Sequence, residues 1–548
     1  MGCKDAPGGE GEGSTGMGPP DDSTSVDTGQ DPPDDAPELD PDSVSEPLAG
    51  RLTDLQYRYT VLDVLGADLT ANEIAALPAD IPTGRDYSTT VEPQFFNSNY
   101  VLAYAEIARS VTARLDPGEL LATHGQCTTA DAGCERAFVE GLGLRLFRRP
   151  LTDVEVERYL ALAAAVGAID ETDNDDAVRG IVQAMLQAPQ FLYRVEDETD
   201  GEPGELRTVD GWELASRLSY FLWQSAPDDA LLAFAAGPDG DGQYDPDALP
   251  DQIDRMLASA KFARSRELFW GDYTLAARSG FATSDTQLAD ELRSSLLATL
   301  DRICGVGAPA QPLTALFDGQ QIMMTPAVAE IAGAQPKGDG LQVYETSEAT
   351  QRLGVVTHPG MLASIGTTSF VGRGLFLSER LLCQHPVVPP ASIGEQIEDT
   401  AQATEDMTPR QASEFRMQIE PVCQGCHLAF EPIAYAFERY DLGGRYSTTD
   451  EQGRELFSDG GLPAAADRDA IAFDDAPQLL TELAGSVSVK ACIVENMTQF
   501  GTGQPANLAG TYHDTATDTF VESDMTFESL VRAVAASEQR TLLRVVQP

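Results

Sequence analysis

The sequence predicts a mainly α-helical protein built from several small helical domains. Apolar residues recur at the spacing of an amphipathic helix over much of the chain, whereas alternating strand patterns are short and few. The 548 residues also exceed what a single hydrophobic core usually organises. We therefore expect several packed helical units.

The predicted helices follow from periodicity and from their end signals. Residues 51–66 place Leu55, Tyr59 and Leu62 on one face and stop at Gly66, a residue that commonly ends helices. A second helix is expected over 134–147. Thr152, with a glutamate three residues later, predicts a capped helix through residue 165. Further helices are expected over 176–187, 212–223, 250–258, 262–270, 285–303 and 489–500.

Residues 1–48 are expected to form a disordered acidic tether. They consist mainly of Gly, Pro, Asp, Ser and Thr, so they offer almost no apolar surface to bury. Cys3 follows Gly2, as the lipidated cysteine follows a small residue in a processed bacterial lipoprotein, and we expect it to be lipidated. The alternative is an unmodified cysteine in a tail.

Charge limits the partners of the chain. It carries 88 acidic and 36 basic residues, a formal net charge of −52. Such a field repels nucleic acid and anionic membrane surfaces, so we expect neither as a partner. Any membrane association is expected to pass through an N-terminal lipid anchor alone.

The sequence Cys423-Gln-Gly-Cys426-His427 is the signal for covalent attachment of haem c. In this interpretation the two thiols form thioethers with the haem, and His427 is the proximal iron ligand. A zinc site or a short disulfide are the alternatives, and a zinc site normally needs a second Cys or His pair nearby. Haem c is attached outside the bacterial cytoplasm, which predicts a periplasmic or cell-surface protein of a Gram-negative bacterium.

The remaining cysteines are consistent with an oxidising compartment. Cys127 and Cys134 lie seven residues apart around a loop-like sequence, and we expect them to form a disulfide. Cys383 and Cys492 are candidates for a second bridge. Cys304 is then left over, and its apolar helical surroundings predict a buried thiol.

Several blocks of the sequence resemble the planctomycete-type multidomain cytochrome c proteins, which also occur in myxobacteria and whose functions are largely unknown. The resemblance implies a tether followed by segments 49–120, 121–195, 196–340, 341–460 and 461–548, with the cytochrome domain at 341–460. The blocks that carry the resemblance are 51–57 (RLTDLQY), 147–159 (FRRPLTDVEVERY), 187–196 (QAPQFLYRVE), 213–223 (ELASRLSYFLW), 354–358 (GVVTH), Arg373-Gly374, Leu382-Cys383, the haem motif, 479–501 and 527–537.

Two departures from the family pattern matter. Longer members begin with an additional C-x-x-C-H domain, which this chain does not contain, so one haem is expected. Phe430 stands where relatives place a methionine or an aliphatic residue after the haem histidine. A distal iron ligand therefore has to come from elsewhere, and we rank His358 slightly above Met497. Met497 has a ready alternative role in a helix core, and His358, which precedes a Pro-Gly turn, has one at the surface.

The leading functional hypothesis is electron transfer by an exported, lipid-anchored haem c protein, as the redox module of an extracellular oxidative system with an unknown redox partner. One alternative is a haem enzyme of peroxidase or oxygenase type, which an open distal position would favour. Another is a surface polymer-binding protein with a structural haem. No nucleophile, base or paired-carboxylate constellation can be assigned by spacing, so catalytic residues stay unknown and enzymatic activity stays undecided.

Overall fold

The computed structural model describes residues 49–78, 80, 86–90, 98–127, 132–167, 174–196, 206–277, 281–365, 370–384, 404, 406–419, 421–464, 469–503, 514–537 and 542–544. Contacts divide the chain into Met1–Asp40 and Pro41–Pro548. The predicted tether and Cys3 lie outside the described residues. All described residues belong to the second unit, Pro41–Pro548.

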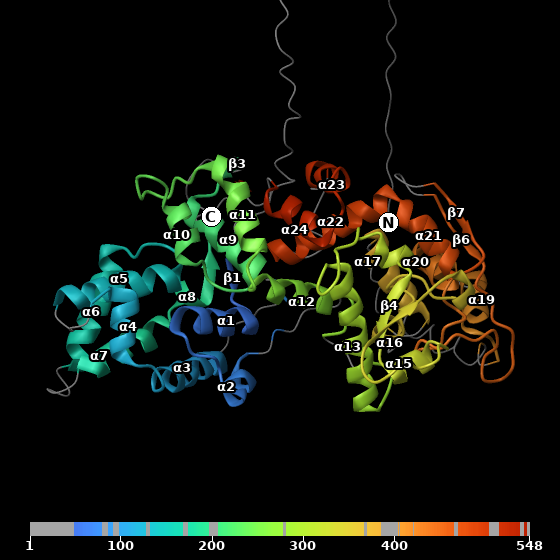
Figure 1. Ribbon diagram of the computed structural model, residues 1–548, viewed down its shortest axis with the longest axis horizontal. Helices are drawn as coiled ribbons and strands as arrows, with labels where there is room; N and C mark the ends of the chain where they lie inside the picture. Colours follow the sequence, from blue (N-terminus) through green and yellow to red (C-terminus); the bar gives the residue numbers. More distant parts are fainter. Residues whose placement is uncertain are drawn as a thin grey trace, which may run out of the picture. The chain divides into compact units, whose positions relative to one another are not determined.

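Helices dominate the described residues, and the strands are only three or four residues long (Figure 1). The mainly α fold predicted from the sequence is confirmed. The elements of the first part are β1 (Ala49–Arg51), α1 (Asp54–Leu65), α2 (Ala71–Ala76), α3 (Ser98–Thr112), α4 (Pro117–Leu120), a π-helical turn (Leu121–Gly125), α5 (Ala132–Phe147), α6 (Asp153–Gly167), α7 (Asn174–Met185), α8 (Pro189–Leu192) and β2 (Tyr193–Val195).

The second part of the chain continues with the same character. Its central elements are β3 (Leu206–Thr208), α9 (Gly211–Trp223), α10 (Asp229–Ala236), a 3₁₀ turn (Pro246–Ala248), α11 (Leu249–Leu257), α12 (Phe262–Tyr273), α13 (Thr286–Ile303), α14 (Ala315–Asp318), β4 (Gln321–Met324), α15 (Pro326–Ile331), β5 (Gln342–Glu345) and a 3₁₀ turn (Glu348–Thr350). The last elements are α16 (Pro359–Ile365), α17 (Phe370–Leu382), α19 (Pro409–Ile419), α20 (Pro421–Tyr435), β6 (Gly460–Leu462), β7 (Ile471–Phe473), α21 (Ala476–Gly485), α22 (Val487–Thr502), α23 (Asp514–Val521), α24 (Phe527–Ala535) and β8 (Leu542–Arg544).

Helix ends follow the capping signals in the sequence. Thr152 accepts a hydrogen bond from the Glu155 backbone N–H at 3.3 Å, and the Glu155 carboxylate accepts from the Thr152 N–H at 2.9 Å, which is the predicted capping box. Gly66 ends α1 in the left-handed conformation with φ 70°. The expected start of the first helix at residue 51 is wrong: α1 begins at Asp54 after an N-cap at Thr53, because residues 49–51 form β1 instead.

Short antiparallel strand pairs join segments that are far apart in the sequence. β1 pairs with β2, placing Ala49 opposite Val195, and β3 pairs with β8, placing Leu206 opposite Arg544. β4 with β5 and β6 with β7 are local pairs. The sequence pattern could not predict these strand pairs, because a strand of three or four residues is too short to show an alternation of apolar and polar residues.

The buried apolar residues described by the structure form two clusters. One gathers side chains between Leu52 and Leu192 together with Tyr220, and the other gathers Tyr87 and side chains between Val209 and Ala535. The predicted boundary at 120/121 lies inside the first cluster, and those at 340/341 and 460/461 lie inside the second. The domain boundaries stay a prediction, but the segments that they separate share their cores.

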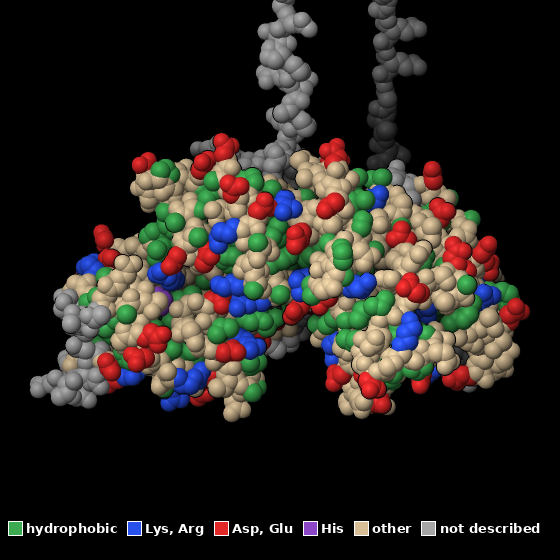
Figure 2. All heavy atoms as spheres, in the orientation of Figure 1, with side chains coloured by type: hydrophobic (Ala, Val, Ile, Leu, Met, Phe, Trp, Pro, Cys, Tyr) green, Lys and Arg blue, Asp and Glu red, His purple; other side chains and the backbone are tan. Residues whose placement is uncertain are grey.

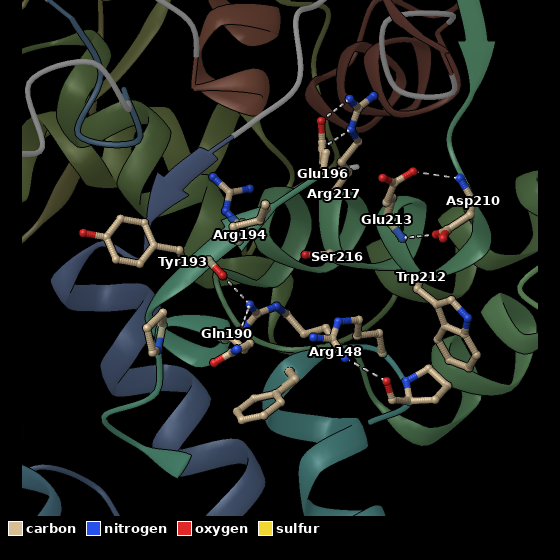
Figure 3. Close-up of a pocket in the computed structure, with 15 residues that line it drawn as sticks. Arg148, Gln190, Tyr193, Arg194, Glu196, Asp210, Trp212, Glu213, Ser216 and Arg217 are labelled. Atoms are coloured by element: carbon tan, nitrogen blue, oxygen red, sulfur yellow. Dashed lines mark hydrogen bonds and ion pairs between the residues drawn. The ribbon is translucent and has the colours of Figure 1, made fainter. Parts of the chain in front are cut away.

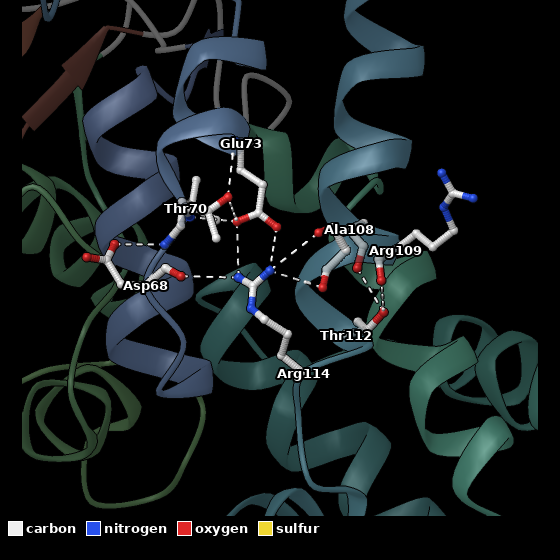
Figure 4. Close-up of polar contacts among 9 residues, drawn as sticks. Asp68, Thr70, Glu73, Ala108, Arg109, Thr112 and Arg114 are labelled. Atoms are coloured by element: carbon white, nitrogen blue, oxygen red, sulfur yellow. Dashed lines mark hydrogen bonds and ion pairs between the residues drawn. The ribbon is translucent and has the colours of Figure 1, made fainter.

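On the face shown in Figure 2, acidic and basic side chains are scattered among polar and apolar ones, with both signs interspersed. Among the described residues, no helix combines the length and the apolar character needed to cross a membrane. A local ion-pair cluster fixes α2 to α3: Arg114 donates to both carboxylate oxygens of Glu73 at 2.6 and 3.1 Å and to the Asp68 carbonyl at 3.2 Å (Figure 4).

The Glu73 cluster makes stability depend on pH. Burial raises the pKa of Glu73, but hydrogen bonds from Arg114, Ser110 and Thr70 outweigh this effect and lower the pKa to about 2, from an ordinary value of 4.5. The ion pair therefore stabilises the fold fully above about pH 4.5, and this contribution is lost as the pH falls towards 2.

We predict that Glu73→Gln lowers the free energy of unfolding by about 1 kcal/mol at pH 7, and that the difference from wild type shrinks below pH about 4.5. Urea unfolding at several pH values measures the difference in the free energy of unfolding between wild type and variant. Hydrogen exchange in α2 and α3 shows whether the loss is local. The matched control is Glu106→Gln, which removes an exposed carboxylate of α3. A difference that stays constant from pH 7 to pH 3 would contradict this origin.

Candidate functional site

Helix α20 carries the whole C-x-x-C-H motif. Positions 423, 426 and 427 are related by three and four residues, so the helix backbone brings them to one face. The side chains of Cys423 and Cys426 lie outside the described residues, whereas that of His427 is described. The candidate haem site is therefore built on a single helix, in which the sequence spacing alone groups the three attachment residues.

The His427 ring is held in one tautomer by a buried carboxylate. Its Nδ1 lies 2.7 Å from Oε1 of Glu431, one helical turn later. The Glu431 side chain is fully buried, while that of His427 is 24 % exposed. A carboxylate accepts hydrogen bonds, so Nδ1 carries the proton and Nε2 keeps its lone pair. No hydrogen bond to Nε2 occurs among the described residues, and this nitrogen is available to a metal.

The second oxygen of Glu431 provides a test of whether this site suits haem iron. Oε2 is buried and has no hydrogen-bond donor among the described residues. A buried carboxylate without a full set of partners is costly unless positive charge lies close by. Iron held by Nε2 of His427 would supply positive charge to this ring and its carboxylate partner. The donor set, with an available imidazole nitrogen and cysteines one and four residues before it in the same helix, fits haem c.

Two exposed side chains lie beside His427 on α20. Gln424 is exposed, and Leu428 is 48 % exposed, although it is apolar. On α20, Gln424 lies three residues before His427, and Leu428 directly follows it. Phe430, Glu431 and Ala434 are buried, and they lie three, four and seven residues after His427 and therefore on its side of the helix. His427 thus lies at the border between this packed face and the exposed side chains of Gln424 and Leu428.

Two neighbouring helices fix α20 in place, α17 and α19, which pack against it (Figure 1). Gly374 of α17 approaches so closely that an added Cβ would lie 2.8 Å from the Phe430 carbonyl oxygen. Ser378 donates to that same carbonyl at 3.3 Å. Arg373 donates to the carbonyls of Phe437 and Tyr440 at 3.0 and 2.9 Å, which fixes the chain just after α20.

The structure contains both expected cysteine pairs. A disulfide joins Cys127 to Cys134, with Cα atoms 5.7 Å apart. A second joins Cys383, just after α17, to Cys492 in α22, with Cα atoms 5.3 Å apart. This bridge ties the helix that packs on α20 to the C-terminal region. Cys304 is buried as expected, and burial raises the pKa of its thiol to about 12.

His358 has a structural role in the core. Its Nδ1 accepts the Gly360 N–H at 2.9 Å, so Nε2 carries the proton and donates to the Met323 carbonyl at 3.1 Å. The side chain is fully buried, and burial lowers its pKa to about 4. The surface role considered from the sequence is therefore wrong. Iron ligation by His358, which the sequence ranking favoured, would require a buried hydrogen bond to break.

Met497 also lies in a core. It is buried in α22 within the second apolar cluster. This position agrees with the core role weighed for it from the sequence. Ligation by Met497 likewise stays a prediction. Neither candidate lies on α17 or α19, the helices that pack against the haem-motif helix.

Sequence reasoning missed Glu431. The signal was present, because a carboxylate four residues after a ligand histidine on a helix lies on the same face and can reach its ring. The motif analysis treated this position only as a departure from the family pattern around Phe430.

Three segments of the chain match protein-family models, all described as families of unknown function. Residues 134–196 match PSD5 (DUF1595), residues 209–333 match PSD4 (DUF1592) and residues 352–450 match PSCyt3 (DUF1588). These matches are consistent with a planctomycete-type multidomain cytochrome c, and α20 lies inside the third. No curated protein and no solved structure matches the chain.

We predict that His358→Ala lowers the thermal midpoint and leaves the spin state of the haem unchanged, because both ring nitrogens already serve backbone groups. The loss of two buried hydrogen bonds and of packing should cost roughly 2–4 kcal/mol. Absorption spectra and thermal unfolding of the haem-loaded protein measure both effects. A change from low-spin to high-spin haem in this variant would instead identify His358 as the distal ligand.

Proposed function

We propose that the chain is an exported protein that binds one haem c and transfers electrons. The observation that carries the proposal is the arrangement of His427 on α20: its Nδ1 is bound to buried Glu431, and its Nε2 is available next to two cysteines in attachment spacing. The matched families, which are consistent with a multidomain cytochrome c, support it.

Each residue of the site has a distinct role in this proposal. Cys423 and Cys426 hold the haem by thioether bonds, and His427 binds the iron through Nε2. When bound, the haem supplies a one-electron redox couple. Glu431 is a positioning residue: it fixes the tautomer and the ring orientation of His427 and increases the electron donation of the imidazole. A strong proximal donor favours the oxidised iron and lowers the reduction potential.

The compartment follows from cysteine chemistry. The two disulfides of the structure persist in oxidising environments, and haem c attachment occurs in the same compartments. An extracytoplasmic location is therefore part of the proposal, as are lipidation at Cys3 and service in an extracellular oxidative system. The redox partner is a protein or molecule that meets the exposed side chains beside His427, those of Gln424 and Leu428.

A peroxidase-type haem enzyme is the second candidate, and the His427–Glu431 pair is the observation that favours it. A histidine with a carboxylate on its Nδ1 donates more electron density to iron than one with a neutral partner. The two functions differ in the distal position: electron carriers fill it, and enzymes leave it open. A low-spin spectrum unaffected by peroxide or carbon monoxide supports electron transfer, and a high-spin spectrum that changes with either supports the enzyme.

We predict that the protein produced in a host with haem c maturation carries an added mass of about 616 Da, one haem per chain. The double variant Cys423→Ser/Cys426→Ser should lose this mass, since no thiol remains for the thioethers. Intact-protein mass spectrometry under denaturing conditions measures it, and Cys304→Ser serves as the matched control. An unmodified mass for the wild type, or bound zinc instead of haem, would refute the proposal.

We predict that Glu431→Gln raises the reduction potential of the haem, because a neutral amide accepts the Nδ1 proton more weakly than a carboxylate. A change of about 1.4 kcal/mol between the two redox states corresponds to about 59 mV for one electron. Potentiometric titration monitored by absorbance measures the shift. Glu451→Gln, which removes an exposed carboxylate, should leave the potential nearly unchanged. Equal potentials for wild type and Glu431→Gln would exclude the tuning role.

A further inference from the structure

A cavity of about 730 Å³ lies where the PSD5 and PSD4 segments meet (Figure 3). Its walls come from the end of α5, from α8 and β2, and from the first turns of α9. Apolar and aromatic side chains, among them Phe147, Pro189, Tyr193 and Trp212, line much of it. This volume is typical of sites for small organic molecules, which often lie between domains.

Arg194 on β2 lines this cavity and has no hydrogen-bond acceptor among the described residues. It is only 6 % exposed, and its Nε is buried without a partner. The ring centroid of Tyr220 lies 5.4 Å from its guanidinium carbon, and its charge also interacts with those of Glu196, Arg148 and Arg217. Figure 3 draws no interaction from its guanidinium to the other residues of the cavity.

Other buried arginines of the described residues all donate hydrogen bonds from their terminal nitrogens. Arg148, just after α5, donates to the carbonyls of Gln190 and Tyr193 at 2.8 and 2.7 Å. The remaining ones and their acceptors are Arg51 with Asp80, Arg217 with Glu196, Arg352 with Thr357, Arg373 with Phe437 and Arg380 with Asn496. The fold satisfies buried guanidinium groups elsewhere, which makes Arg194 an exception.

The carboxylates of the cavity bind other groups. Glu196 accepts from Arg217 at 2.6 and 2.7 Å, and Glu213 accepts from Arg207 at 2.8 and 2.9 Å. Asp210 caps α9 by accepting the Glu213 N–H at 2.7 Å. Four arginines and three carboxylates line the cavity, in a chain with more than twice as many acidic as basic residues. The cavity is thus a local region of positive charge.

A buried guanidinium without an acceptor is costly. Burial lowers the pKa of Arg194 to about 10, so the group stays charged at neutral pH. The planar guanidinium matches a carboxylate through two parallel hydrogen bonds. The cavity is far larger than an inorganic anion and has apolar walls, so an organic body fits beside the charge.

We propose that this cavity binds a small organic carboxylate, whose carboxylate group pairs with Arg194 and whose apolar body lies against Tyr193 and Trp212. The site is separate from α20 and does not depend on haem. It adds a binding function to the part of the chain that precedes the cytochrome-like segment.

Isothermal titration of the full chain with benzoate and with benzamide tests this proposal, because the two molecules share a shape and differ in charge. We expect benzoate to bind with a Kd of about 1 mM or tighter, and benzamide at least tenfold more weakly. Arg194→Gln should weaken benzoate binding at least tenfold. Arg158→Gln, which removes an exposed arginine of α6, should leave binding unchanged.

Stability separates a binding role from a structural one. Without ligand, Arg194→Gln should melt at the wild-type temperature or higher, because it removes an unpaired buried charge. Should this variant fail to fold, Arg194→Lys keeps the charge but loses the planar fork, and at least tenfold weaker benzoate binding by it supports the proposal.

Several results would overturn the proposal. They are equal binding of benzoate and benzamide, equal benzoate binding by wild type and Arg194→Gln, or binding of inorganic phosphate in place of benzoate. Absence of benzoate binding by wild type would also overturn it.

Discussion

The hydrogen bond between His427 and buried Glu431 is the contact on which the candidate haem site depends. It determines which nitrogen of the ring carries a proton and therefore which one can bind iron. The bond joins a fully buried Glu431 to a His427 side chain that is 24 % exposed. Gly374 allows α17 to pack closely on this part of α20, because an added Cβ would lie 2.8 Å from the Phe430 carbonyl oxygen. The disulfide between Cys383 and Cys492 then ties the end of α17 to α22.

Buried arginines connect the irregular parts of a fold that has few and short strands. Arg148, Arg352 and Arg373 donate mainly to backbone carbonyls, which would otherwise be buried without partners. Each of them joins segments that are distant in sequence, such as Arg352 and Gly444, 92 residues apart. Although the chain has only 36 basic residues against 88 acidic ones, several of its arginines are thus buried inside the fold. Arg194 is buried in the same way but lacks an acceptor, which is why its cavity is a candidate binding site.

Helices with strong local signals could be predicted from the sequence. Thr152 with Glu155, and Gly66, mark helix ends by chemistry that acts within a few residues, and the structure has these ends where expected. The haem motif could be found for the same reason, because its three residues are adjacent on one helix. Tertiary relations could not be found in this way. The strand pair of β1 with β2 spans more than a hundred residues, and the burial of His358 depends on α13 and β4, which its local sequence does not reveal.

The pyridine haemochrome spectrum of the purified full chain tests the central claim most directly, because it reports both the amount of haem and the state of its vinyl groups. Our account predicts one haem per chain with both vinyl groups saturated by thioether bonds to Cys423 and Cys426. Haem with intact vinyl groups would show that the motif does not attach it covalently. A chain that contains no haem after expression with a working maturation system would contradict the account as a whole.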